Sequence, residues 1–102
     1  MLNLITWEEA KEMIENTTGY ALLDVRTPEE YAQGHIKGAK LVPGDELAAH
    51  TEDYLPDKDQ PVLLYCRTGR RSATAARMLY EKGYKNIYDF GGLTEWPYEV
   101  VK

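Results

Sequence analysis

The stretch Pro61-Val-Leu-Leu-Tyr-Cys66-Arg-Thr-Gly-Arg-Arg-Ser72 decides which fold to expect. Its first six residues form a short, continuously apolar run, which is typical of a strand covered on both faces. Residues 72–82 predict a helix with an apolar face, and Gly83 can take the left-handed conformation that ends it. A buried strand that passes through a tight loop into a helix is the repeating unit of a parallel α/β sheet.

The rest of the chain repeats this alternation of strands and helices. Further strands are predicted at Tyr20–Val25 and Asn86–Phe90, with shorter ones at Ala39–Val42 and Leu2–Ile5. Helices are predicted after the capping residues Thr6 and Thr27, at Asp45–Leu55, and briefly after the Gly91-Gly92 pair. We therefore predict an α/β fold with a central, mostly parallel five-stranded sheet flanked by helices on both faces.

Size and composition narrow the function. The 102 residues fit a single domain spanning 1–102, and the net charge of −5 argues against nucleic acid or an anionic membrane as partner. The stretch from Cys66 to Arg77 departs from this balance, because it holds four arginines and no acid. A cationic segment in an acidic protein favours a small anionic ligand.

The single cysteine also limits the chemistry. It excludes an internal disulfide and a multi-thiolate metal site, and no metal or cofactor signature is present. No apolar run approaches the about 20 residues of a membrane helix. A free thiol and an N-terminus without a signal-peptide pattern predict a cytoplasmic location.

Cys66 lies where a parallel sheet binds ligands, at the carboxyl end of a strand. A thiolate is stabilised by nearby cations and by a helix N-terminus, and both are expected beside Cys66. Gly69 allows a tight curl in which backbone N–H groups point at an anion. Arg70 or Arg71 can add a bidentate contact to an oxyanion. A lone cysteine is more often a small buried hydrophobe, but the surrounding arginines favour a nucleophile.

The motifs together resemble the rhodanese domain family over nearly the whole chain. The matching stretches, in order, are Asp24-Val25-Arg26, Pro28-Glu29-Glu30-Tyr31, Gly34-His35-Ile36, Gly38-Ala39, Cys66-Arg67-Thr68-Gly69-Arg70-Arg71-Ser72, Gly83-Tyr84, and Gly91-Gly92 followed by Trp96. Each motif alone is weak, whereas their order and spacing are specific.

The resemblance implies a sulfurtransferase that works by double displacement. Cys66 would take the outer sulfur of a donor such as thiosulfate and hold it as a persulfide, then pass it to a thiophilic acceptor: cyanide, a small thiol or a thioredoxin-like protein. The expected substrate-binding residues are Arg67, Thr68, Gly69, Arg70, Arg71 and Ser72. Ser72 is equally well explained as the N-cap of the following helix.

Other residues shared with the family have mainly structural interpretations. Arg26 and Glu30 are expected to pair and to fix the helix that begins at Pro28. Asp24 is expected either to orient groups near the loop or to serve a structural hydrogen bond. His35 is interpreted as a structural or gate residue rather than a general base, and Trp96 as a packing residue.

Two other functions compete with this hypothesis. Phosphatases and arsenate reductases on the same scaffold use C-x5-R, whereas Cys66 and Arg71 are spaced as C-x4-R and Ser72 stands where C-x5-R needs arginine. A non-catalytic module that binds a protein partner, or relays sulfur to it, is the main alternative. Such modules often lack the cysteine or the basic loop, and this chain has both.

Overall fold

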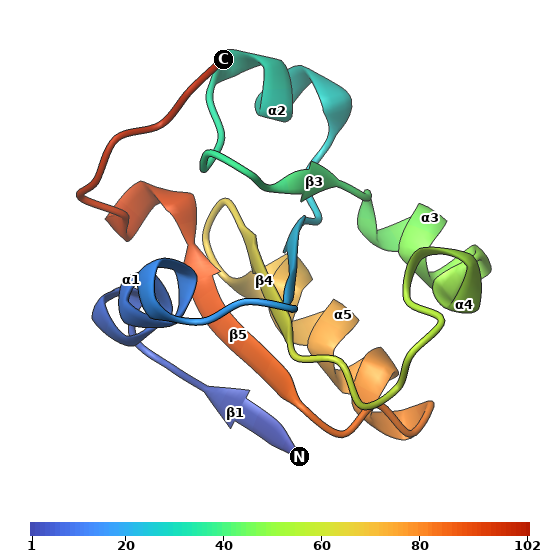
Figure 1. Cartoon of the computed structure of the whole chain (residues 1–102). Coiled ribbons are helices and arrows are strands. Elements are labelled where there is room, and N and C mark those ends of the chain that lie inside the picture. The colour runs from blue at the N-terminus through green and yellow to red at the C-terminus, as the bar shows by residue number, and fades with distance from the viewer.

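The computed structural model describes residues 1–102 and contains one five-stranded sheet (Figure 1). The strand order is β1-β5-β4-β2-β3, and every neighbouring pair is parallel. The strands are β1 (Leu2–Leu4), β2 (Ala21–Asp24), β3 (Lys40–Leu41), β4 (Val62–Cys66) and β5 (Ile87–Gly92). The predicted α/β class with five strands is confirmed, and the sheet is parallel throughout.

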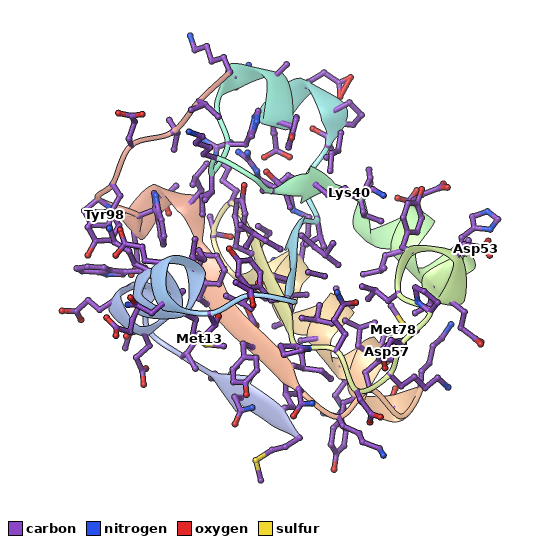
Figure 2. All side chains as sticks on the ribbon, in the orientation of Figure 1. Met13, Lys40, Asp53, Asp57, Met78 and Tyr98 are labelled. Atoms are coloured by element: carbon purple, nitrogen blue, oxygen red, sulfur yellow. The ribbon has the colours of Figure 1, made fainter.

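Helices cover both faces of the sheet, as predicted. They are α1 (Trp7–Asn16), α2 (Pro28–Gln33), α3 (Gly44–Ala49), α4 (Thr51–Tyr54) and α5 (Arg70–Glu81), followed by the 3₁₀ turn η1 (Leu93–Glu95). Figure 1 shows α1 on one side of the sheet and α3, α4 and α5 on the other. Figure 2 labels Met13 on the α1 side and Met78 on the α5 side.

The central strand β4 separates the two halves of the core. All five of its residues are buried, and their side chains alternate between the faces because successive residues of a strand point to opposite sides. Leu63 and Tyr65 pack in the cluster on the α1 side. Cys66 packs with Val62 and Leu64 in the cluster on the α5 side. The strand therefore fixes which face the sulfur belongs to.

Two helix starts are formed by the capping boxes that the sequence predicts. The Glu9 N–H donates to Thr6 Oγ1 at 3.0 Å, and the Thr6 N–H donates back to Glu9 Oε1 at 2.9 Å. Thr27 and Glu30 repeat this exchange at 3.3 and 3.1 Å at the start of α2. Each box satisfies backbone donors that have no partner within the helix.

Several predicted boundaries were wrong. Helix α5 begins at Arg70 rather than Ser72, with Gly69 as its N-cap. The helix expected at 45–55 is two short helices, α3 and α4, which meet at His50. Strand β3 is shorter than predicted, and β5 continues through Gly91 and Gly92. None of the helices has the length and apolar character that crossing a bilayer requires.

Candidate active site

Cys66 ends β4 at the carboxyl edge of the sheet, and the chain curls back over its sulfur. The residue is fully buried, and the Gly69 N–H donates to Sγ at 3.0 Å. Gly69 has a φ of 101°, which places it in the left-handed region that favours glycine. The same residue is the N-cap of α5, so the positive end of that helix lies beside the loop. Strand end, left-handed glycine and helix start thus form one cradle around the sulfur.

A second loop, which follows β5, holds the Cys66 loop in place. The Arg67 carbonyl oxygen accepts from the Thr94 N–H at 3.2 Å and from Thr94 Oγ1 at 3.1 Å. A Cβ at Gly92 would lie 2.3 Å from this carbonyl oxygen and 2.7 Å from Thr68 Cα. Only glycine fits such an approach between two backbones. The conformation of the loop is therefore set by a segment about 25 residues further along the chain.

Ser72 also helps to hold the cysteine loop in place. Its hydroxyl donates to Asp89 Oδ1 at 2.8 Å, with the Gly69 carbonyl as an alternative acceptor at 3.1 Å. Asp89 Oδ1 also accepts from the Gly91 N–H at 3.0 Å. Ser72 is fully buried and Asp89 nearly so. The alternative interpretation of Ser72 as the N-cap was wrong, because α5 begins two residues earlier and the side chain is bonded to β5 instead.

Arg71 pairs with Glu30 across the opening between α5 and α2. Nη1 and Nη2 donate to Oε1 and Oε2 at 2.7 and 2.9 Å, a bidentate pair. The hydrogen bond from Arg71, aided by those from Thr27, lowers the pKa of Glu30 to about 2. The prediction that Arg26 pairs with Glu30 was wrong. Glu30 instead accepts hydrogen bonds from the Thr27 N–H at its own helix start and from Arg71.

Arg26 pairs with Asp24 instead. Its Nε and Nη2 donate to the two carboxylate oxygens at 2.9 and 2.7 Å, and Nη2 also donates to the Gly34 carbonyl at 2.7 Å. The Tyr65 hydroxyl donates to Asp24 Oδ2 at 2.8 Å and accepts from the Ile36 N–H at 3.1 Å. Burial raises the pKa of Tyr65, so the hydroxyl keeps its proton. Of the two roles open to Asp24, the structure shows the hydrogen-bonding one.

The match to known proteins agrees with this geometry. The model of the rhodanese-like domain family matches residues 6–98, which include the cysteine loop and the segment that fastens it. The chain belongs to the rhodanese-like domain family.

Several relatives share most of the length of this rhodanese domain. The thiosulfate sulfurtransferase PspE of Escherichia coli is 39% identical over 80 residues, which is 78% of this chain and 77% of the relative. A sulfurtransferase of Allochromatium vinosum is 34% identical over 97 residues, covering 94% and 89% of the two chains. These relatives support sulfurtransferase activity in this rhodanese domain.

Solved structures of other proteins have a fold similar to that of this rhodanese domain. A structure described as rhodanese with anions, from E. coli, has a TM-score of 0.75 and 37% identity, covering 81% of this chain and 98% of its own. A rhodanese-related protein from Thermoplasma volcanium has a TM-score of 0.83 and 29% identity over 97% of each chain.

The remaining predicted loop residues of the rhodanese site lie at its rim. The side chains of Arg67, Thr68 and Arg70 are exposed, and neither Arg67 nor Arg70 forms an ion pair. His35 stacks on Tyr31, with ring centroids 3.6 Å apart, and its backbone bridges to Val101. These contacts fit the structural one of the two roles expected for His35, and the gate role stays a prediction. Trp96 packs against Phe90 and Tyr98, also as expected.

Sequence reasoning missed the residues that fasten the loop. Asp89 and Thr94 were assigned no role, and the Gly91-Gly92 pair was interpreted only as the start of a short helix and as a family motif. A glycine pair after a strand was also a signal that two backbones approach closely. The partner of Arg71 was missed as well, because Glu30 precedes it by 41 residues.

Proposed function

We propose that this chain moves a sulfane sulfur from thiosulfate, or a similar small anionic donor, to a thiophilic acceptor by way of a persulfide on Cys66. The observation that carries the proposal is the cradle at the end of β4. It holds one thiol under an N–H donor, at a helix start, and the same loop carries the exposed side chains of Arg67 and Arg70, which form no ion pair. The chemistry that this environment favours is attack by a thiolate on an anionic sulfur compound.

The first step transfers sulfur to the protein. The Cys66 thiolate attacks the outer sulfur of thiosulfate and forms a new S–S bond. The S–S bond of thiosulfate breaks, and its electron pair leaves with sulfite. Arg67, Thr68, Gly69, Arg70 and Arg71 are the residues that we assign to donor binding. Backbone N–H groups stabilise the anionic sulfur, and the guanidinium groups contact the oxygens of the donor.

The second step regenerates the thiolate. Cyanide, a small thiol or a thioredoxin-like protein attacks the outer sulfur of the persulfide, the S–S bond breaks, and the electron pair returns to Cys66 Sγ. The hydroxyl of Ser72 is bonded to Asp89 and not to the sulfur. We therefore assign Ser72 a positioning role, in which it holds the start of α5 against β5.

The PspE relative, whose name includes thiosulfate, supports the choice of donor. Exposed arginines at the rim of the loop support it independently, because they can neutralise a dianion. The cytoplasmic location and the extent of the domain over 1–102 stay predictions.

Intact-protein mass spectrometry tests the persulfide directly. Incubation with thiosulfate is expected to add one sulfur atom, about 32 Da, at Cys66, and cyanide is expected to remove it, as a covalent intermediate requires. The Cys66→Ser variant serves as the control and should gain no mass. Absence of the adduct on wild-type protein whose thiol is free and reduced would contradict the proposal.

A further inference from the structure

A cavity of about 640 Å³ lies beside the cysteine loop, between α3 and α5. Pro43, Ala48 and Met78 contribute apolar walls, while Arg70 and Arg71 lie at the end nearest the loop. Figure 2 places Met78 on the same side of the sheet as α3 and α4. This volume falls in the range of pockets that bind small organic molecules.

The cavity adjoins the buried environment of the nucleophile. Val25 and Ala75 line the cavity, and both belong to the packed cluster that contains Cys66. The side chain of Cys66 therefore lies on the face of the sheet that the cavity occupies. The cavity wall and the nucleophile therefore share part of one packed cluster.

The charges around the cavity are unevenly distributed. Arg70 and Arg71 are at the loop end, and Glu30 neutralises only Arg71. Asp45 is the acidic residue of the lining and comes from the first turn of α3. An anionic reacting group is thus favoured at the loop end, whereas the walls between the two ends favour hydrocarbon.

We propose that this cavity binds the apolar body of a small organic thiol, the acceptor that takes sulfur from Cys66. The inference rests on the proposed function and adds the chemical class of its acceptor. The thiolate attacks the outer sulfur of the persulfide Cys66–S–SH and forms the S–S bond of an organic persulfide, RS–SH. The S–S bond between Cys66 Sγ and the outer sulfur breaks, and its electron pair returns to Sγ as the thiolate.

Cyanide provides the reference reaction, because a diatomic ion is too small to fill a cavity of this volume. Two thiols of similar acidity separate the effect of the apolar body from that of reactivity. Phenylmethanethiol carries an aromatic ring, whereas 2-mercaptoethanol carries a small polar group. Binding the ring in the cavity buries apolar surface, which should favour phenylmethanethiol by about tenfold in kcat/KM.

The test uses two tryptophan variants of adjacent residues on α3. Ala48→Trp fills the cavity, whereas Ala49→Trp places the same side chain on an exposed residue outside its lining. Each protein is loaded with thiosulfate, and transfer to phenylmethanethiol, 2-mercaptoethanol and cyanide is measured as kcat/KM. Organic persulfide products are identified by mass spectrometry after alkylation.

The expected result is a selective loss in one variant. The preference for phenylmethanethiol over 2-mercaptoethanol, normalised to cyanide, should fall from about tenfold to less than about threefold in Ala48→Trp and stay unchanged in Ala49→Trp. Thr74→Trp, which fills the cavity from α5, should repeat the loss if Ala48→Trp folds poorly.

Each other outcome identifies what has failed. If wild-type protein does not discriminate between the two thiols, or if Ala49→Trp loses the preference equally, the cavity is not the acceptor site, although sulfur transfer to cyanide still stands. If thiosulfate does not load Cys66 at all, both the proposed function and the acceptor site are overturned.

Discussion

The ends of two neighbouring strands, β2 and β4, carry arginines that differ in what surrounds them. At the end of β2, Arg26 is buried and gives its guanidinium to Asp24, which also accepts from Tyr65. At the end of β4, Arg67 and Arg70 are exposed and form no ion pair. A buried cation must be paired to offset the cost of desolvation, whereas an exposed one stays available to a ligand. The comparison separates a structural strand end from a reactive one.

Arg71 lies between these two cases. It is half-exposed, and its guanidinium is paired with Glu30 from another helix. A donor that needs Arg71 must share it with Glu30 or displace that carboxylate. The bidentate pair thus neutralises part of the positive charge of the loop. Fewer unpaired arginines are available to the donor than the sequence suggests.

Replacing the nucleophile is expected to have the largest effect. Cys66→Ser should lower sulfur transfer by at least about a thousandfold, because the hydroxyl is a far weaker nucleophile than a thiolate at neutral pH. The free energy of unfolding should change little, since the side chains are nearly isosteric. A thiosulfate-to-cyanide assay and a denaturant titration measure the two quantities. Transfer at the wild-type rate would remove Cys66 from the mechanism.

Asp24→Ala should lower the stability of the fold more than it lowers the rate of sulfur transfer. Removing the carboxylate leaves the Arg26 cation buried without its partner, which is expected to cost about 3–5 kcal/mol of unfolding free energy. Urea unfolding followed by circular dichroism provides the measurement. Glu29→Ala, an exposed residue on α2, is the matched control and should change stability by less than about 0.5 kcal/mol. Equal stability of both variants would mean that the Asp24 network is not structural.

Arg71→Ala should impair the use of thiosulfate more than it lowers stability. The expected result is an increase of about tenfold in KM for thiosulfate, because a charge-assisted contact to the donor is lost. The pair with Glu30 is partly exposed, so its removal should cost less than about 1 kcal/mol of stability. Steady-state kinetics and thermal unfolding measure the two effects. An unfolded variant would show that Arg71 is structural.

Glu30→Gln should give the smallest effect and in the opposite direction. Glutamine keeps the capping interaction with Thr27 and removes the charge that holds Arg71, so KM for thiosulfate should fall by about threefold. Kinetics of this variant beside Glu30→Ala, which loses the cap too, separates the charge from the helix start. An unchanged KM would indicate that Glu30 does not compete with the donor.

The stability difference between the wild type and Glu30→Gln should depend on pH. Folding lowers the pKa of Glu30 from 4.5 to about 2, so its ionised form stabilises the fold above pH 4.5 and this contribution is lost as the pH falls towards 2. The wild type should therefore be more stable than Glu30→Gln by less than about 1 kcal/mol at neutral pH and lose that advantage in acid. Unfolding titrations across this range measure the difference.

Local patterns were enough to predict much of the fold. Apolar runs marked β2, β4 and β5, and the two Thr-x-x-Glu boxes marked the starts of α1 and α2. They failed where several short elements meet. His50 divides the segment 45–55 into two helices, and nothing in its composition marks the break. Helix α5 begins at Arg70 because Gly69 turns the chain over the sulfur, a constraint that a periodic pattern does not contain.

The strand–loop–helix unit around Cys66, the surplus of arginines there and the family of the chain could all be recognised from the order of the amino acids. Those features are local, since they depend on the order of neighbouring residues. Which arginines stay unpaired depends on the folded structure. It paired Arg26 with Asp24 and Arg71 with Glu30, and it fastened the cysteine loop to Gly92 and Thr94. Asp24 and Arg26 lie only two residues apart, whereas the other partners are brought together by the order of the strands in the sheet. Burial then decides which charges must be paired.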